Sequence, residues 1–372
     1  MKRSLALLSL LSLSLSLAAC KPAAPNTIKI GYVGPLTGDA ASLGVDQMNG
    51  AKMAIDEMNV KNGASGQQFV LIAEDGRCNG ADGANAGQKL INVDGVQAII
   101  GGLCSSETLA MAPIAEAAKV VILSPGSSAP AISDAGTYIF RNYPSDAIKT
   151  VATAKIFAEK GYKKIALISE NTDFCQGVRG GLKKDLLTDA LVFDEVVDPG
   201  TKDVRSILTK WKNKPFDVFY VNTNGDAQMG PIIQQFRDAG FKQPIFSHEV
   251  ADSANLGKAV TAAVEGMQLV TVKTAGEGTD FEKAFTDKFG KPQSSIAFAA
   301  HAYDATNLMM KTIAEKGNMG TAIRDALTAM AGYTGIIGTF NFDQNGDVVG
   351  VPFVLKEFKN GSTFTVQSIS LE

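Results

Sequence analysis

Several features that many enzymes and nucleic-acid-binding proteins need are scarce in this chain. Its 372 residues include two histidines, His248 and His301, which restricts acid–base chemistry that depends on imidazole. The net charge is −3 and no run of lysine and arginine stands out, which argues against nucleic acid as the main partner. After the first 20 residues, no apolar stretch reaches the length needed to span a bilayer.

The first 26 residues are expected to lie outside the folded lobes. Residues 1–3 form a positively charged start, and residues 5–17 form an apolar run of signal-peptide type, too short to span a bilayer comfortably. Leu17-Ala18-Ala19-Cys20 resembles a bacterial lipobox, in which the cysteine receives a diacylglycerol. We therefore expect a lipoprotein signal peptide over 1–20, lipid on Cys20, and a short extended tether over 21–26. The alternative is an ordinary secretory signal with an incidental cysteine.

The remaining cysteines fit an exported protein. If Cys20 carries lipid, an odd number remains: Cys78, Cys104 and Cys175. Cys78 and Cys104 each lie where a strand is expected to give way to a turn, so we pair them. In the chain-entropy description, such a loop stabilises the fold by roughly 3.5 kcal/mol. Cys175 is then left as a free thiol.

An enzyme is the main alternative class of function, and the sequence offers little for it. Residues 31–35 lack the glycine spacing of a dinucleotide-binding loop. His301 lies in a helical pattern with Tyr303 and Asp304, where packing explains it better than catalysis. Cys175 would be a nucleophile only beside a base, and an incidental thiol is the simpler interpretation in an exported protein. We expect no enzymatic activity, no cofactor and no metal.

From residue 27 onward, short β-rich runs alternate with amphipathic helical stretches, and the length favours two lobes. This βαβ pattern predicts parallel sheets with helices on both faces. The first series has expected strands at 28–33, 69–73, 96–100 and 120–123, and helices at 44–59, 81–92 and 105–118.

Residues 141–146 interrupt the pattern, and a second series follows. Hairpin signals at 340–347 and 360–362 then mark a change of character towards the C-terminal end. Two α/β halves followed by a β tail indicate several crossings between lobes. The second series has expected strands at 164–169, 191–197, 216–221, 244–246 and 266–272, and helices at 147–160, 281–289, 295–316 and 321–331.

Two small-residue turns follow buried strands of the first half. Residues 99–108 run from a strand through glycines into a helix that starts at Ser105 and Ser106, where free N–H groups and the helix dipole favour an anion. Residues 120–128 end in a similar serine-rich loop, and ligands gather at the carboxyl ends of parallel strands. The simpler interpretations are N-capping by one of the serines and a loop of turn-forming residues.

Glu249 follows an expected strand of the second half, at residues 246–249. A carboxylate in that position could hold an ammonium group. The simpler interpretation is a solvated loop carboxylate, which is the usual case for glutamate.

The chain contains four short motifs, at residues 34–38, 103–106, 124–128 and 342–347. Together, and in this order, they resemble motifs of the periplasmic leucine/isoleucine/valine-binding proteins. The likeness extends from about residue 28 to the end, and paired Cys78 and Cys104 match the disulfide of that family. The resemblance implies the type I periplasmic binding protein fold: two doubly wound parallel-sheet lobes, joined by three hinge crossings, that close on a ligand. Its expected partner is an ABC-type permease in the cytoplasmic membrane.

The resemblance also assigns roles to individual residues. Ser105 and Ser128 match positions that hold an α-carboxylate, with backbone groups near Gly126 and Ser127 in the same cluster. Glu249 matches the carboxylate of the second lobe that holds the α-ammonium. An amino-acid zwitterion would then have each of its charges paired in a desolvated cleft.

The pocket for the ligand's side chain departs from the family pattern. Leu43 replaces an aromatic residue, Phe174 replaces a tyrosine and is followed by Cys175, and Asn224 lies in a stretch that is often rich in tyrosine. Phe298 keeps an aromatic residue near a pocket position, although core packing explains Phe174 and Phe298 equally well. A branched-chain or other aliphatic amino acid is favoured, with another amino acid or a small amide as alternatives.

These observations combine into one prediction. The chain is expected to be a monomeric solute-binding component of an amino-acid ABC importer, lipid-anchored in the periplasm or cell envelope. The alternatives are a ligand-binding sensor that signals through a membrane receptor and an exported enzyme. The first lobe is expected to comprise 27–146 and 273–356, and the second lobe 147–272 and 357–372.

Overall fold

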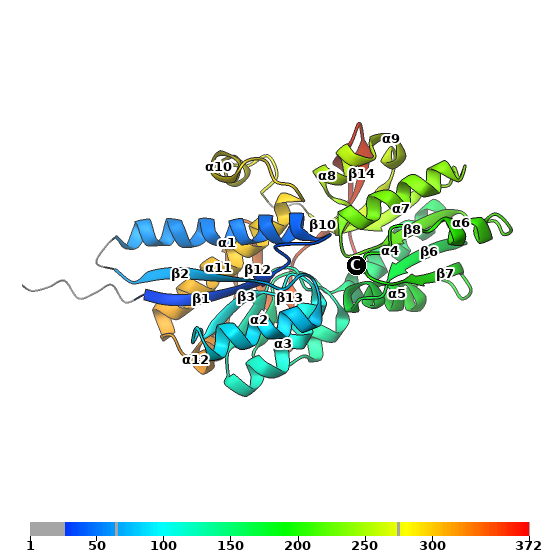
Figure 1. Cartoon of the computed structure of the whole chain (residues 1–372). Helices are drawn as coiled ribbons and strands as arrows, with labels where there is room; N and C mark the ends of the chain where they lie inside the picture. The colour runs from blue at the N-terminus through cyan, green and yellow to red at the C-terminus, as the bar shows by residue number, and fades with distance from the viewer. Residues whose placement is uncertain (1–26, 64–65, 274–275, 372) are drawn as a thin grey trace, which may run out of the picture.

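The computed structural model describes residues 27–63, 66–273 and 276–371. The expected signal peptide, the expected lipidation site Cys20 and the tether over 21–26 lie outside the described residues. Within the described part, the chain forms two lobes, each built on its own sheet (Figure 1). No helix in that part combines the length and the apolar character required to cross a membrane.

The first lobe contains a five-stranded, all-parallel sheet with strand order β2-β1-β3-β4-β5. Its central strands β3 and β4 are short and wholly buried, as expected when helices cover both faces of a parallel sheet. The strands are β1 (Thr27–Gly34), β2 (Gln68–Asp75), β3 (Ala98–Gly101), β4 (Val121–Ser124) and β5 (Ile139–Arg141).

Helices cover both faces of this sheet. On one face α1 and α11 pack together, and their apolar residues Ile55, Leu308 and Met309 join one hydrophobic core with the strands. On the other face α2 and α3 form a second core that includes Leu90 and Met111. The helices are α1 (Ala41–Asn62), α2 (Gly80–Asn92), α3 (Ser105–Ala118), α10 (Asp280–Phe289), α11 (Ile296–Lys316) and α12 (Gly320–Thr328).

The second lobe contains a seven-stranded mixed sheet with strand order β15-β14-β10-β9-β8-β6-β7. Its strands β6 to β10 are parallel, whereas β14 and β15 are added antiparallel at one edge. The strands are β6 (Ile165–Glu170), β7 (Leu191–Val197), β8 (Val218–Asn222), β9 (Ile245–His248), β10 (Gln268–Val272), β14 (Phe353–Lys359) and β15 (Ser362–Ile369).

In the described part of the chain, six helices and a short turn of 3-10 helix accompany this sheet. Of these helices, α4 was expected from the sequence, whereas α5, α6, α7, α8 and α9 were not. At the end of β9, the 3-10 turn η2 carries Glu249. The elements of the second lobe are α4 (Asp146–Lys160), α5 (Asp173–Asp185), α6 (Arg205–Trp211), α7 (Asp226–Asp238), η2 (Glu249–Ala251), α8 (Ala254–Ala259) and α9 (Thr261–Val264). The first lobe also contains a 3-10 turn, η1 (Pro130–Asp134).

The chain passes between the lobes three times, as expected: between β5 and α4, between β10 and α10, and between β13 and β14. Strands β11 (Tyr333–Gly335), β12 (Gly338–Phe342) and β13 (Val348–Val349) form a small sheet that packs on the first lobe through Phe140 and Phe342. The third passage differs from the expected boundary at residue 356. Residues 353–356 pair with β10 in the second sheet, so this passage precedes Phe353.

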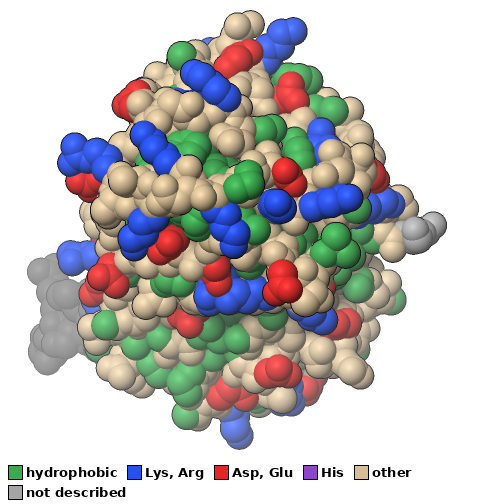
Figure 2. Space-filling view, turned by 90° about the vertical axis from the view of Figure 1, so that its right-hand side faces the viewer, with side chains coloured by type: hydrophobic (Ala, Val, Ile, Leu, Met, Phe, Trp, Pro, Cys, Tyr) green, Lys and Arg blue, Asp and Glu red, His purple; other side chains and the backbone are tan. Residues whose placement is uncertain are grey.

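The end of the second lobe presents a mixed surface. Figure 2 shows lysine and arginine side chains interspersed with aspartate and glutamate on this face, without a broad area of one charge. Alternating charges of this kind keep a surface soluble and provide no extended basic track.

Candidate functional site

The first wall of the site is the turn between β3 and α3. Glu107, in the first turn of α3, is completely buried and accepts hydrogen bonds from the backbone N–H groups of Cys104 and Cys78, both at 2.9 Å. Cys104 is the N-cap residue, so neither serine has the capping role that was the simpler interpretation. Burial raises the pKa of Glu107 to about 7, partly opposed by these hydrogen bonds. The expected disulfide joins Cys78 to Cys104 and fastens the same turn.

Serine hydroxyls join this turn to the next one, after β4. The hydroxyl groups of Ser124 and Ser127 donate to the carbonyl oxygen of Gly102 over 2.7 and 2.9 Å. The backbone N–H groups of Gly126 and Ser127 donate to Ser124 Oγ, so this loop already uses them.

Ser105 and Ser128 retain unused hydrogen-bonding capacity. Ser105 Oγ accepts from the backbone N–H of Ala129 at 3.1 Å, which leaves its own proton available. Ser128 Oγ is buried and has no hydrogen-bond partner among the residues that the structure describes. Ser105 begins α3, where the helix dipole favours an anion. Ser128 immediately precedes Ala129, the residue whose N–H group bonds Ser105, but neither Ser127 nor Ser128 lines the cavity between the lobes.

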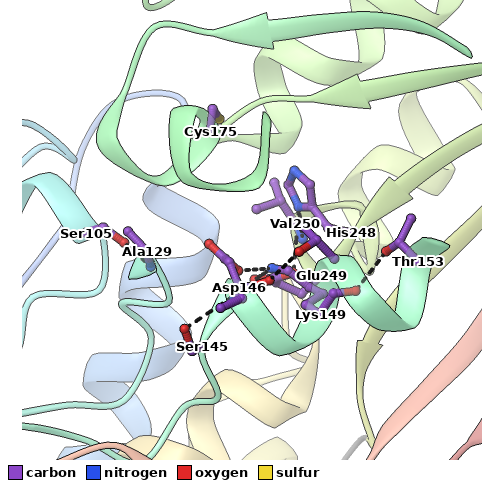
Figure 3. Close-up of polar contacts among 12 residues, drawn as sticks. Ser105, Ala129, Ser145, Asp146, Lys149, Thr153, Cys175, His248, Glu249 and Val250 are labelled. Atoms are coloured by element: carbon purple, nitrogen blue, oxygen red, sulfur yellow. Dashed lines mark hydrogen bonds and ion pairs between the residues drawn. The ribbon is translucent and has the colours of Figure 1, made fainter. Parts of the chain in front are cut away.

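The second wall is provided by Glu249 at the end of β9. Its side chain is buried, and Lys149 Nζ donates to both of its carboxylate oxygens, over 2.6 and 2.5 Å. Lys149 Nζ also lies 2.6 Å from Asp146 Oδ1, within the first turn of α4. Figure 3 shows Asp146, Lys149 and Glu249 meeting at one point, with Ser105 and Ala129 facing them from the first lobe. We call these three charged residues the acidic triad.

The acidic triad joins two acidic side chains to one basic side chain. Burial raises the pKa of Glu249 and Asp146 adds to the effect, whereas the nearby Lys149 opposes it. Burial alone would lower the pKa of Lys149, but Asp146 and Glu249 raise it overall, so its ammonium stays charged. His248 adds no charge, because burial and Lys149 hold the pKa of its imidazole well below the ordinary value. The cluster therefore brings two carboxyl groups and one ammonium together in a buried place.

A small cavity lies between the walls. The free volume inside is about 20 Å³, which holds a water molecule but no amino acid. The lobes are therefore shut in this conformation. Of the nine residues expected to contact a ligand, seven line the cavity, and Leu103, Cys104 and Val250 line it as well. The seven are Leu43, Ser105, Gly126, Phe174, Asn224, Glu249 and Phe298.

Contacts at the rim explain the tight closure. Gly225 in the second lobe lies directly against the backbone of Asp39 in the first lobe, and a Cβ atom on it would come within 2.3 Å of the Asp39 carbonyl oxygen. Lys202 Nζ lies 2.9 Å from Asp39 Oδ1, and Ser42 Oγ lies 3.3 Å from Asp226 Oδ1. Each of these pairs joins the two lobes.

Asp146 and Lys149 were not expected from the sequence to be part of the site. Both are buried, whereas their apolar neighbours Ile148 and Val151 on α4 are 42% and 43% exposed. Charged residues inside and apolar ones outside reverse the usual helical pattern. No single window of the sequence shows this reversal, because it depends on what α4 packs against.

Cys175 is a free, buried thiol, as expected. Its Sγ lies 3.7 Å from Asn224 Oδ1, and burial holds the pKa of the thiol well above its ordinary value. A protonated, buried thiol is a poor nucleophile. Across the described ranges, no group of three or more His, Cys, Asp or Glu side chains is placed to hold a metal ion.

The chain is similar to known proteins over most of its length. The family model described as "Periplasmic binding protein" matches residues 27–362. The leucine-, isoleucine-, valine-, threonine- and alanine-binding protein of Pseudomonas aeruginosa is 30% identical over 350 residues, covering 92% of each chain.

Solved structures agree on the fold. The branched-chain amino acid transporter substrate binding protein LivJ from Streptococcus pneumoniae, in complex with isoleucine, aligns with a TM-score of 0.83 at 25% identity, over 92% of this chain and 99% of that one. A solute binding protein of an ABC transporter from R. palustris, in complex with benzoate, aligns with a TM-score of 0.82 at 19% identity, over 92% and 96%. The second likeness concerns the fold alone.

Proposed function

Since this chain belongs to the periplasmic binding protein family, we propose that it captures an aliphatic amino acid in the extracytoplasmic space and delivers it to an ABC importer. Proteins of this family bind solutes and are not enzymes. The relatives from P. aeruginosa and S. pneumoniae are named for branched-chain amino acids, which supports this class of ligand.

One observation carries the proposal: Ser105 and Glu249 line the same small cavity from opposite lobes. Ser105 offers a hydroxyl at a helix N-terminus, which suits a carboxylate. Glu249 offers a carboxylate, which suits an ammonium. An α-amino acid carries both groups on one carbon and would join the two lobes.

The charge of the acidic triad favours an amino acid over a simple carboxylate such as benzoate. A ligand with a carboxylate alone would leave the excess negative charge of the triad buried without a partner, which is costly. A zwitterion brings an ammonium that pairs this charge, while its carboxylate meets the serine hydroxyls and the dipole of α3.

The apolar lining supports an aliphatic side chain. Leu43, Leu103, Phe174 and Phe298 supply apolar surface, and Asn224 adds one polar group at the edge. Ligand pockets commonly combine mostly apolar walls with a few polar groups that fix orientation. We therefore favour leucine, isoleucine or valine, with a small polar amino acid as the next candidate.

The same proposal includes a lipid anchor on Cys20 and transfer of the ligand to a permease in the cytoplasmic membrane. A lipid anchor would keep the binding protein close to the membrane that holds the permease. Mass spectrometry of the N-terminal peptide from membrane fractions would show the added diacylglycerol and acyl masses. The C20S variant should lack these masses and appear in the soluble fraction.

Calorimetric titration tests the central claim. We expect the wild-type protein to bind an aliphatic amino acid and to reject 4-methylpentanoate, which has leucine's carboxylate and side chain but no ammonium. E249Q should lose about 1.5–3 kcal/mol of binding free energy, the usual value for a hydrogen bond to a charged group. This loss corresponds to roughly ten- to hundredfold weaker affinity. Equal binding of leucine by wild type and E249Q would refute the role of Glu249.

A further inference from the structure

Lys149 is the least expected residue near the cleft. Its side chain is 2% exposed, and its ammonium lies 4.9 Å from the centre of the Phe174 ring, which lines the cavity. A buried ammonium is costly unless it is paired, and here both Asp146 and Glu249 pair it. The residue is therefore built into the acidic wall of the cleft.

Two carboxylates this close to one another would not both stay ionised without a cation. Like charges sharing a buried site raise one of the two pKa values strongly. With Lys149 between them, the pair keeps a single excess charge, and Asp146 Oδ2 has no hydrogen-bond partner within the described residues. Glu249 still has lone pairs to offer, because an ionised carboxylate has about four acceptor positions.

The other titratable groups around the triad leave its charge unchanged. His248 is held neutral, and the pKa values of Tyr143, Tyr220 and Cys175 are raised well above their ordinary values, chiefly by burial. Asp252, on the same side of the lobe, is paired with Lys356 at 3.0 Å.

We propose that Lys149 sets the charge of the ligand site: it keeps Glu249 ionised and leaves one negative charge, which matches one ligand ammonium. This inference rests on the proposed function, because it assigns Glu249 to the ammonium. Lys149 is thus a positioning residue that acts through Glu249 and does not contact the carboxylate of the ligand.

The test compares the wild type, K149M, and the double variant D146N/K149M by calorimetric titration with L-leucine between about pH 6.5 and 8.5. In K149M the two carboxylates share a proton that the ligand ammonium must displace, so affinity should rise with pH by up to about tenfold per unit. Binding should also release a proton, seen as a dependence of the measured heat on the buffer. The double variant again has one negative charge, and its pH profile should return towards that of the wild type. K149R should behave as the wild type.

A second arm needs no ligand. In K149M the folded-state pKa of the carboxylate pair exceeds its unfolded value, so stability is greatest at low pH and is lost as pH rises through the folded pKa. Thermal unfolding of K149M should therefore fall more steeply between about pH 5.5 and 7.5 than that of the wild type or the double variant.

The outcomes separate the two claims. If the wild type binds no amino acid, the proposed function fails, and the ligand-free arm still decides the role of Lys149. If leucine binds but K149M has the pH profile and buffer dependence of the wild type, the inference is overturned and the proposed function stands.

Discussion

Ser128 holds a buried hydroxyl without a hydrogen-bond partner in the described part of the chain, and Ser105 holds one with a proton to spare. An unpaired buried polar group costs about 1–3 kcal/mol, and a ligand carboxylate at Ser128 would recover that cost. We expect S105A and S128A each to weaken amino-acid binding by about 1–3 kcal/mol in calorimetric titrations.

The free protein provides the contrast for these variants. Because the Ser128 hydroxyl has no hydrogen-bond partner within the described structure, S128A should leave the ligand-free unfolding temperature unchanged or raise it. S362A, at an exposed position on β15, is the matched control and should change neither quantity. Wild-type affinity in S128A would remove this residue from the site.

Glu107 makes stability depend on pH at a single residue. Its folded pKa of about 7 exceeds the ordinary value of 4.5, so its contribution is complete below 4.5 and is lost as pH rises to about 7. In E107Q that loss disappears, but the amide replaces one of two acceptors for the Cys78 and Cys104 N–H groups. We expect E107Q to be less stable overall by about 1–3 kcal/mol, with a smaller decline between these pH values.

Chemical denaturation at several pH values measures both effects together. E116Q is a suitable control, since Glu116 lies near the other end of the same helix, α3. A steeper decline in E107Q than in the wild type would contradict the assignment.

At the scale of elements, the disulfide between Cys78 and Cys104 joins the loop after β2 to the start of α3. It closes a loop with a sequence separation of 26 residues. We expect the C78S/C104S variant to lose roughly 3.5 kcal/mol of unfolding free energy, measured by denaturant titration. Binding should weaken too, because Cys104 lines the cavity. C175S serves as the control, because that thiol forms no disulfide.

Some elements could be predicted from sequence to the residue, and others could not. Helix α3 occupies 105–118, as expected, because glycines and a serine pair mark its start and a strand follows it closely. Helices α5 and α7 were missed. Helix α5 contains Gly177, Gly180 and Gly181, and α7 contains Pro231, all poor helix formers. Packing against the sheet outweighs these local preferences.

The site shows the same division. Ser105 and Glu249 could be predicted because each follows a strand, and the carboxyl ends of parallel strands gather around a ligand. Leu43 and Asn224 came from the family resemblance and also line the cavity. Lys149 could not be predicted, since its partner Glu249 lies 100 residues away and the pairing exists only after folding.

At the scale of the molecule, closure depends on how closely two backbones approach. Gly225 touches Asp39 only when the lobes are shut, and a Cβ atom there would meet the Asp39 carbonyl. Overpacking of this kind costs roughly 1–3 kcal/mol. We expect G225A to bind its amino acid about ten- to hundredfold more weakly, without losing stability in the free form. Small-angle scattering should show less contraction on ligand addition than in the wild type.

G180A is the matched control for this variant. Gly180 lies on α5, where a Cβ atom would meet no atom within 4 Å. This substitution should leave affinity and contraction unchanged, and it should stabilise the helix slightly. Full contraction of G225A with ligand would show that the rim tolerates an extra methyl group.

The chain passes between the lobes three times: between β5 and α4, between β10 and α10, and between β13 and β14. A single chain passage would let one lobe twist and slide against the other. Several passages restrict the motion of the lobes to bending about a hinge. If the lobes open and close on a ligand as proposed, Ser105 and Glu249 should return to the same alignment at each closure. The specificity of ligand recognition would then depend on the three chain passages as well as on the side chains that contact the ligand.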